Sequence, residues 1–434
     1  MSGLKKVLTI VCCVLLLTVG WIAAVFSKSD SAKQKELIQE AQMYLEDEIY
    51  VKAVPLLEEA AGYSAKHSQT AEKLLKKSYQ KLLKTSGYSR KYALLLEAEM
   101  SREETGPEVY LEAGKFYLGM HKNQKAFDAL KRGIEKTGSE ELETFYESKR
   151  YEYMARWDTY QDVTQFLNGM IQVQQDGYWG LANSQGELKL PCDYRFCSTY
   201  YNGEAIVRKG NVWQGVDLNG NRVALYKGDT VKEITNFNEN RLGVHRADGW
   251  VLATGQLNTG STVLEELRAY SDGGAAAKQN GKWGVVDHTG KEWLLEPAYD
   301  EIICDELGRC WTDGAVFVKQ GEQVLLLVDG AQVGESYEDA QPFTNSWAAV
   351  KRDGKWGFID REGTVQIDFQ FENARSFTNH LAPVCVDDTW GYVSLKGDVV
   401  IDPIFLDAKQ FSKGTAPVRT ADGWKFISLL EYAD

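Results

Sequence analysis

An aromatic residue followed thirteen positions later by a tryptophan recurs along the C-terminal three-fifths of this 434-residue chain. The clearest copy runs from Phe343 to Trp356, and an eighth, worn copy has Cys310 and Gln323 at the two positions. The other intact copies are Phe166 to Trp179, Tyr200 to Trp213, Phe237 to Trp250, Tyr270 to Trp283, Phe377 to Trp390 and Phe411 to Trp424. A fixed period decides the architecture, because each repeat is one structural unit that must stack on its neighbours.

Each copy has the pattern of a small antiparallel sheet. Ala348 and Val350 alternate in the clearest copy, and the equivalent positions of all copies are small or apolar, which indicates a strand with one buried face. Asp353-Gly354 then predicts a hairpin turn, since both central residues of such turns have positive φ. Trp356 opens a second strand and a third follows Gly363. The repeat domain, residues 163–434, is therefore expected to hold about eight three-stranded units.

Two segments carry a family resemblance. Gly354–Gly363 reads Gly-Lys-Trp-Gly-Phe-Ile-Asp-Arg-Glu-Gly and Gly281–Gly290 reads Gly-Lys-Trp-Gly-Val-Val-Asp-His-Thr-Gly; both resemble the bacterial WG repeat. Trp179-Gly180 and Trp390-Gly391 fit it too, whereas Trp213-Gln214, Trp250-Val251, Trp424-Lys425 and the worn copy depart from it. The resemblance implies a β-repeat array, frequently joined to other modules and mostly without an assigned activity.

Two arrangements of the repeats remain open, and a closed β-propeller is favoured over an open β-superhelix. The chain ends soon after the second strand of the last copy, and a closed ring can complete that blade with an N-terminal strand. An open superhelix would instead need a cap at each end.

The preceding residues, 29–162, have the spacing of amphipathic helices. Two sets of small and large residues share the same offsets and resemble tetratricopeptide repeats, which are pairs of antiparallel helices. The sets are Ala41, Tyr44, Ala53, Leu57 and Ala60, and Gly114, Tyr117, Ala126, Leu130 and Gly133. A last helix is expected from Ser139 to Ala155. This tetratricopeptide-like domain is expected to form either a groove for a peptide or a structural stalk.

The N-terminus predicts a membrane anchor in residues 1–28. Lys5 and Lys6 precede an uncharged run, residues 7–26, which is long enough to cross a hydrocarbon core of roughly 30 Å. A cleaved signal peptide is the competing interpretation, but its apolar region is normally shorter. The two lysines favour a single-pass protein with a cytoplasmic N-terminus and the bulk of the chain outside a bacterial cell.

Composition and motifs exclude more functions than they suggest. The net charge of −13 argues against nucleic acid as a partner. The sequence holds none of the common phosphate-binding, metalloprotease or serine-hydrolase motifs, so we expect no catalytic residues, no cofactor and no metal site. Asp217, Asp287 and Asp360 precede turn glycines, and Asx-turn capping explains them best.

The seven cysteines do not form a complete disulfide framework. Cys192 and Cys197 could pair, as could Cys304 and Cys310, but the favoured interpretation is that they are free buried thiols.

The repeated tryptophans could bind sugars, but their fixed strand position favours packing between units. They are therefore assigned a structural role: Trp179, Trp213, Trp250, Trp283, Trp356, Trp390 and Trp424. Binding residues are better sought in loops that differ between copies, and the most distinctive of these is Cys304–Thr312.

The sequence thus predicts a non-enzymatic, membrane-anchored binding or scaffold protein of the α+β multidomain class. Its extracytoplasmic repeat domain would recognise a protein or a cell-envelope ligand. The alternatives are a glycan-binding lectin or glycan-active enzyme at the cell surface, and a structural spacer without a specific ligand. The oligomeric state is left open by the sequence.

Overall fold

The computed structural model describes residues 30–226, 231–255, 259–344, 347–378 and 380–432. The chain divides into two compact units. A helical unit ends at Phe145 and a β-unit begins at Tyr146, and the short segment His121–Phe127 is grouped with the second unit. The predicted boundaries at residues 28/29 and 162/163 remain predictions.

The helical unit consists of short helices joined by tight turns. Residues 30–46 are helical. The following helices are α2 (Tyr50–Ala61), α3 (Ser68–Lys81), α4 (Tyr88–Met100), α5 (Pro107–Gly119), α6 (Asn123–Thr137) and α7 (Glu140–Lys149). Helix α7 ends six residues before Ala155, so the predicted continuation of that helix is wrong: Tyr153–Ala155 instead form a strand.

Small residues let these helices approach closely, as their spacing predicts. A Cβ atom added to Gly114 would lie 2.7 Å from a methyl carbon of Leu130, and one added to Gly133 would lie 2.5 Å from Cβ of Tyr110. Ala53 and Leu57 are fully buried. The resemblance to tetratricopeptide repeats itself stays a prediction.

The predicted transmembrane helix requires correction. The run at residues 7–26 lies outside the described residues, and no helix among those described is both long and apolar enough to cross a membrane. A single-pass anchor, and the cell-surface location deduced from it, are therefore not supported.

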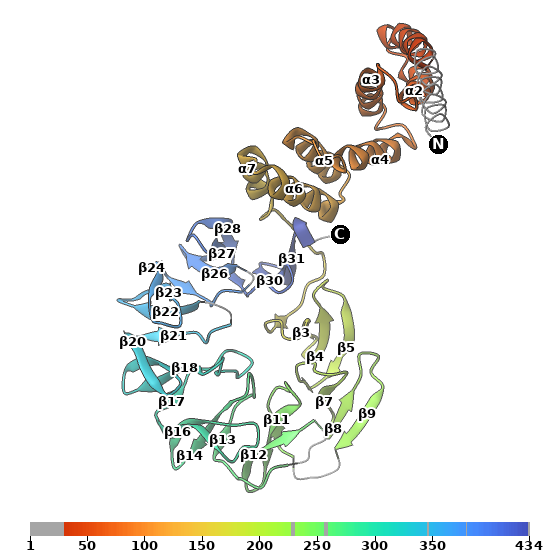
Figure 1. Ribbon diagram of the computed structural model, residues 1–434. Helices are drawn as coiled ribbons and strands as arrows, with labels where there is room; N and C mark the ends of the chain where they lie inside the picture. Colours follow the sequence, from red (N-terminus) through yellow and green to blue (C-terminus); the bar gives the residue numbers. More distant parts are fainter. Residues whose placement is uncertain (1–29, 227–230, 256–258, 345–346, 379, 433–434) are drawn as a thin grey trace, which may run out of the picture. The chain divides into compact units, whose positions relative to one another are not determined.

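The β-unit is a β-propeller in which the described residues form eight sheets, the blades (Figure 1). Blades 1 to 4 contain β2–β5 (Asp162–Val163, Met170–Gln175, Tyr178–Asn183, Leu188–Tyr194), β6–β9 (Phe196–Cys197, Ala205–Lys209, Val212–Val216, Arg222–Tyr226), β10–β12 (Glu233–Ile234, Arg241–Arg246, Gly249–Thr254) and β13–β16 (Glu266–Leu267, Ala275–Gln279, Lys282–Val286, Trp293–Tyr299). Blades 5 to 7 contain β17–β20 (Glu301–Ile302, Ala315–Gln320, Gln323–Val328, Ala331–Tyr337), β21–β24 (Asp339–Ala340, Ala348–Arg352, Lys355–Ile359, Val365–Phe371) and β25–β28 (Asn373–Ala374, Leu381–Val386, Thr389–Ser394, Val399–Phe405). Blade 8 contains β29–β31 (Asp407–Ala408, Thr415–Thr420, Gly423–Leu429) and β1 (Tyr153–Ala155).

The ring is closed by β1, the first strand of the unit. Tyr153, Met154 and Ala155 pair antiparallel with Leu429, Ser428 and Ile427 of β31. Between blades 8 and 1, a core cluster joins Trp424 and Phe426 to Phe166. Similar clusters fill each of the other junctions between neighbouring blades. The favoured propeller is therefore correct, and the open superhelix is excluded.

Most blades have one strand more than the predicted three. The additional strand has only two residues, such as Asp339–Ala340, which pairs with Lys351 and Val350. Two residues are too few to show a periodic pattern. The hairpin itself forms as predicted: Asp353 and Gly354 have φ values of 51° and 75°, as required at both centres of a two-residue turn.

Blade 5 holds an apolar residue in place of the missing tryptophan. In blade 6, Trp356 pairs with Lys351 and Phe371. The equivalent partner of Lys319 and Tyr337 in blade 5 is Val324, which is 1% exposed, whereas Gln323 is exposed. The predicted equivalences of Cys310 with the aromatics and of Gln323 with the tryptophans are both wrong by one position. Thr312 donates to the carbonyl oxygen of Phe343 as Thr344, which follows Phe343, donates to that of Phe377. Trp311 therefore holds the aromatic position of blade 5, and Val324 follows it by thirteen residues.

Candidate functional site

Blade 5 differs from its neighbours at the centre of the ring. In blade 6 the short first strand ends at Ala340 and the aromatic Phe343 follows three positions later. In blade 5 the short strand ends at Ile302 and the equivalent Trp311 follows nine positions later. Blade 5 therefore has six additional residues here, and the segment includes a five-residue turn, Asp305–Arg309, which we call the axial loop.

The axial loop folds around the carboxylate of Asp305. One carboxylate oxygen accepts hydrogen bonds from the N–H groups of Leu307 and Arg309, both at 2.9 Å. The other oxygen pairs with the guanidinium of Arg309 at 2.7 Å. Gly308 has φ of 84°, and a Cβ atom there would lie 3.2 Å from the backbone nitrogen of Ala269. Only glycine fits this position without strain.

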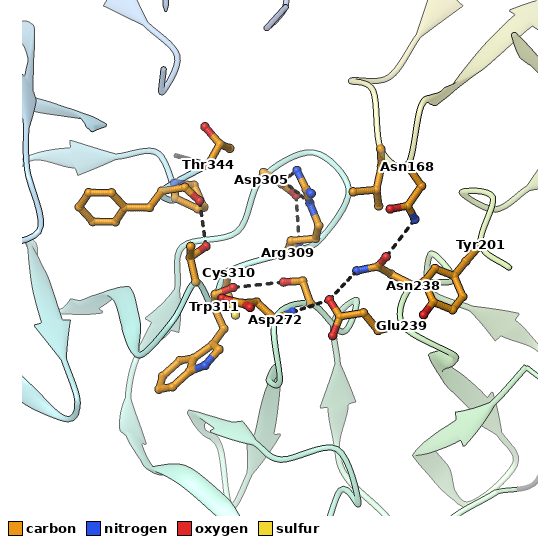
Figure 2. Close-up of a pocket in the computed structure, with 15 residues that line it drawn as sticks. Asn168, Tyr201, Asn238, Glu239, Asp272, Asp305, Arg309, Cys310, Trp311 and Thr344 are labelled. Carbon is orange, nitrogen blue, oxygen red and sulfur yellow. Dashed lines mark hydrogen bonds and ion pairs between the residues drawn. The ribbon is translucent and has the colours of Figure 1, made fainter. Parts of the chain in front are cut away.

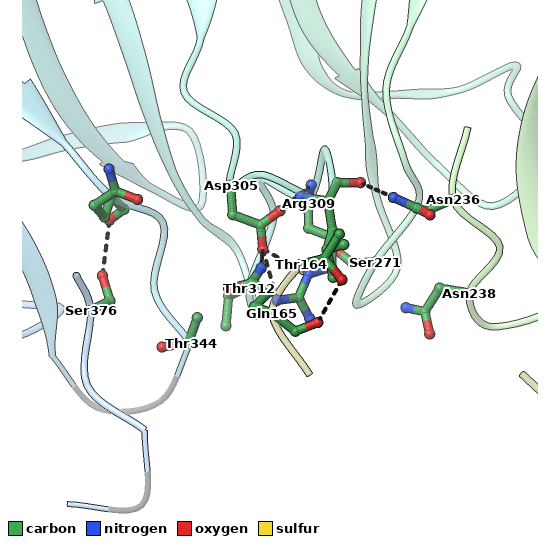
Figure 3. Close-up of polar contacts among 12 residues, drawn as sticks. Thr164, Gln165, Asn236, Asn238, Ser271, Asp305, Arg309, Thr312, Thr344 and Ser376 are labelled. Atoms are coloured by element: carbon green, nitrogen blue, oxygen red, sulfur yellow. Dashed lines mark hydrogen bonds and ion pairs between the residues drawn. The ribbon is translucent and has the colours of Figure 1, made fainter. Parts of the chain in front are cut away.

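Contacts to distant blades hold the axial loop at the centre of the propeller (Figure 3). Gln165 of blade 1 donates to the Asp305 carboxylate, and Asn236 of blade 3 donates to the carbonyl oxygen of Leu307 at 3.1 Å. Lys409 of blade 8 forms an ion pair with Glu306. Two of these contacts reach residues more than one hundred positions from the loop in sequence.

The ion pair between Glu306 and Lys409 lies in a confined environment. Lys409 is 6% exposed, and its ammonium group lies 5.0 Å from the ring centre of Trp424. The surrounding protein raises the pKa of Glu306, and the positive charge of Lys409 opposes this effect. The Glu306 side chain nevertheless keeps 37% of its surface accessible, so solvent screens part of the interaction.

Beside the axial loop is a cavity of about 370 Å³, which we call the axial cavity (Figure 2). This volume is in the range of small-ligand and side-chain pockets. The lining comes from blades 1 to 6 and is drawn mainly from the residues that follow the repeat aromatic: Leu167, Asn168, Tyr201, Asn238, Glu239, Ser271, Asp272, Asp305, Arg309, Cys310, Trp311, Thr312, Pro342, Phe343 and Thr344.

Hydrogen bonds between different blades fix this lining. Asn168 donates to the side-chain oxygen of Asn238 at 3.1 Å. The carboxylate of Glu239 accepts the N–H of Asp272 at 2.7 Å. The hydroxyl of Thr312 donates to the carbonyl oxygen of Phe343 at 2.9 Å. The cavity wall is thus held in place by the ring and not by one mobile segment.

The charge of the axial cavity is negative. Its lining includes three carboxylates, Glu239, Asp272 and Asp305, and one guanidinium, Arg309. Arg309 is already paired with Asp305, and Glu239 and Asp272 are both exposed. The arrangement therefore suits a cationic group better than an anionic one.

The predicted structural tryptophans lie mostly in the junctions between blades. Trp213, Trp283, Trp356, Trp390 and Trp424 are buried, whereas Trp179 and Trp250 are half-buried. Cationic side chains cover several of them, as Arg375 covers Trp390 with its guanidinium carbon 4.4 Å from the ring centre. Their structural assignment stays a prediction that the mutations below test.

The turn aspartates are not brought together. Asp217 accepts the N–H groups of Asn219 and Asn221, both at 2.8 Å, and Asp360 likewise accepts the N–H of Thr364 at 2.8 Å. These bonds are those of Asx turns. Among the residues that the structure describes, no group of three or more acidic, histidine or cysteine side chains could hold a metal ion.

Sequence reasoning identified the Cys304–Thr312 segment but missed most of the cavity. Asn168, Asn238, Glu239 and Asp272 come from three separate repeats of the chain, and nothing local marks them. A signal does exist in the alignment of the copies, because these residues occupy the first or second position after the repeat aromatic.

The repeats match a known family. The family described as "WG containing repeat" matches residues 159–179, 179–213, 283–322, 336–356, 356–390 and 390–424. Three of these matches run from one repeat tryptophan to the next. The region between Trp213 and Trp283 is unmatched, and it contains the departures Trp213-Gln214 and Trp250-Val251. These matches support a WG-repeat protein, and such repeat propellers are typical of non-enzymatic binding and scaffold proteins.

Comparison with individual proteins shows only distant similarity. No curated protein matches the sequence significantly. Hsv2 of Kluyveromyces lactis is 11% identical, with a TM-score of 0.35 over 61% of this chain and 96% of that one. Apo AztD from Citrobacter koseri is 12% identical, with a TM-score of 0.35 over 63% of this chain and 96% of that one. Similarities this distant do not bear on function.

Proposed function

We propose that this WG-repeat protein is a non-enzymatic binding or scaffold protein whose propeller binds a basic segment of a partner protein at the axial cavity. The observation that carries the proposal is the cavity of about 370 Å³, lined by residues that differ from copy to copy. Most of the aromatic and apolar residues that recur in every copy are buried in the core, so they are not available to a ligand. Specificity is expected where the copies diverge.

The chemistry of the lining supports a cationic ligand. Glu239 and Asp272 are exposed and add negative charge next to the paired Asp305 and Arg309. A lysine or arginine side chain that enters the cavity would gain charge-assisted hydrogen bonds to these carboxylates. The net charge of the whole chain, −13, would also steer a basic partner toward it.

The helical region would act as a second module in this proposal. We take the predicted limits, residues 29–162 for a tetratricopeptide-like domain and 163–434 for the WG-repeat domain. The tight helix packing at Gly114 and Gly133 supports helical hairpins. Such hairpins present a peptide groove when several are stacked.

Binding of defined peptides to the full chain tests the proposal. Fluorescence anisotropy would compare a lysine- and arginine-containing peptide with the same peptide in which every basic residue is glutamate. We expect binding of the basic peptide, weakened by salt, and a loss of about tenfold in affinity for Glu239→Gln, since one charged contact is worth on the order of 1.4 kcal/mol.

A matched variant controls for general electrostatics. Glu322 is an exposed glutamate on a hairpin turn outside the cavity lining, so Glu322→Gln removes the same charge without touching the site. Equal loss in both variants would refute binding at the axial cavity. Binding of soluble cell-wall oligosaccharides in place of basic peptides would favour the lectin alternative, and binding of neither would favour a structural spacer.

A further inference from the structure

The axial loop repeats a turn that the propeller uses elsewhere. In Asp217–Asn221 the N–H of Asp217 donates to the carbonyl oxygen of Asn221, and the N–H of Gly220 donates to that of Asp217, both at 3.0 Å. In Asp305–Arg309 the equivalent bonds are 2.8 Å and 2.9 Å. The aspartate also accepts the N–H groups of the third and fifth residues in both turns. The two five-residue turns therefore have the same backbone hydrogen-bond pattern.

The residues that flank this turn are paired across two strands. Val216 and Arg222, which flank Asp217–Asn221, are antiparallel partners. Ile359 and Val365 flank the turn at Asp360 and are also partners. The same holds for Ala182 and Leu188 around the turn at Asn183. The turn thus sets its two flanking residues opposite each other wherever it occurs in a hairpin.

Two cysteines occupy the flanking positions of the axial loop. Cys304 precedes Asp305 and Cys310 follows Arg309. Opposed residues of an antiparallel pair have Cα atoms about 4.5–5.5 Å apart, which is in the range that a disulfide requires, about 4.4–6.8 Å. The two side chains also lie in the same part of the core, because Cys304 packs against the core cluster that contains Cys310.

We propose that Cys304 and Cys310, both free thiols in this structure, are a disulfide-forming pair that closes the neck of the axial loop when the protein meets a small-molecule disulfide oxidant. Cys304 is partly exposed, and Cys310 lines the axial cavity, so a small oxidant has a route to the pair. The bond clamps the loop that forms one wall of the cavity. The pair is therefore a modification site next to the candidate binding site.

The reaction is thiol–disulfide exchange in two steps. The thiolate of Cys304 attacks one sulfur of the oxidant, whose own S–S bond breaks and releases one thiol. Cys310 then loses its proton and attacks the Cys304 sulfur, releasing the second thiol. Two protein thiols are oxidised to one disulfide and one small disulfide is reduced to two thiols. Because the neighbouring Cys304 thiol and burial raise the pKa of Cys310, we expect the second step to be faster at alkaline pH.

Peptide mapping of the full chain after treatment with oxidised glutathione tests the proposal. Arg309 lies between the two cysteines, so trypsin releases residues 292–309 and 310–319 as separate peptides. We expect mass spectrometry to find them joined, with the mass of two hydrogen atoms lost, and to find them separate after reduction. Recovery of both as unlinked or glutathione-blocked peptides would overturn the proposal.

The chain contains a matched control pair. Arg195 lies between Cys192 and Cys197, so the same digest separates residues 190–195 from 196–208. Cys192 packs against the cluster between blades 8 and 1, whereas Cys197 belongs to the cluster between blades 1 and 2. We expect this pair to stay unlinked under the same conditions. Equal linkage of both pairs would show unfolding or indiscriminate oxidation and would overturn the proposal.

A substitution in the axial loop tests the role of the turn. Asp305→Ala removes the carboxylate that organises the axial loop and leaves both cysteines in place. If the turn sets the two thiols opposite each other, the rate of linkage falls several-fold in this variant while alkylation of Cys385 is unchanged. An unchanged rate of linkage would contradict the argument from turn geometry.

Discussion

Blades 5 and 6 are neighbours and both are four-stranded sheets, yet different side chains fill the same buried position in their cores. Blade 6 places Trp356 opposite Phe371, and blade 5 places Val324 opposite Tyr337. Both residues are buried, at 5% and 1% exposed. A blade therefore requires an apolar side chain at this register position, and the tryptophan is a common but replaceable solution.

The two blades also differ in where they place their turns. Blade 6 joins its third and fourth strands by the five-residue turn that begins at Asp360. Blade 5 joins them by a two-residue turn, Asp329-Gly330, and carries the five-residue turn at Asp305 instead. The same local structure is thus found at the hairpin end in one blade and at the ring centre in the next. Because this turn is held by hydrogen bonds among its own five residues, it can form at different places in a blade.

The largest effect should come from removing the tryptophan of blade 6. Trp356→Ala deletes a side chain packed between blades 6 and 7, and we expect a loss of ~3–5 kcal/mol in the free energy of unfolding. Val324→Ala in blade 5 should cost only about 2 kcal/mol, since it removes two methyl groups. Denaturant titration measures both. Gln323→Ala should change stability by less than about 0.5 kcal/mol, and a larger cost there than at Val324 would break the proposed register.

A smaller effect is expected from the axial loop, which blade 6 lacks. Glu306→Gln leaves the buried ammonium group of Lys409 without its partner carboxylate. Because Glu306 is itself partly exposed, we expect a loss of about 1–2 kcal/mol, less than for a fully buried pair. The double variant Glu306→Gln/Lys409→Met should recover most of this loss. Two losses that simply add would show that the residues act independently.

The smallest effect is expected at Asp287, in the turn that joins the third and fourth strands of blade 4. At the same position blade 5 has the shorter turn Asp329-Gly330. Burial raises the pKa of Asp287, but hydrogen bonds from Thr289, Lys291 and Glu292 outweigh it and lower the pKa overall. A lowered folded-state pKa adds stability at neutral pH, and this is lost as the pH falls below about 4. Asp287→Asn should therefore cost about 1 kcal/mol at pH 7 and converge with the unmodified chain in acid. A pH-independent difference would show that the carboxylate charge is not involved.

The repeat pattern was sufficient to predict the β-repeat units and to favour a closed propeller over an open superhelix. The alternation around Ala348, the turn at Asp353-Gly354 and the incomplete last copy are local features, and each is read within one repeat. The predicted register of blade 5 was wrong by one residue because it was counted from Cys310, whereas Trp311 holds the aromatic position. The additional residues before Trp311 hide this position from a fixed count.

The centre of the ring could not be predicted in the same way. The ion pair between Glu306 and Lys409 joins residues 103 positions apart, and Gln165 reaches Asp305 over 140 positions. Such contacts depend on which residues of a closed ring face one another across it. A single sequence does not show which residues of the ring lie opposite each other. It does show that the other copies have no segment like Asp305–Arg309 between the short first strand and the repeat aromatic.

The closing strand β1 has a consequence for synthesis of the chain. Tyr153–Ala155 leave the ribosome long before Ile427–Leu429, the residues that they pair with. Blades 1 to 7 can each form a sheet as they emerge, but the eighth waits for translation to reach its far end. Until then β1 has an unpaired edge, and a product that stops before β31 keeps it. A premature stop near the C-terminus would therefore leave β1, at the N-terminal end of the domain, without its partner strand.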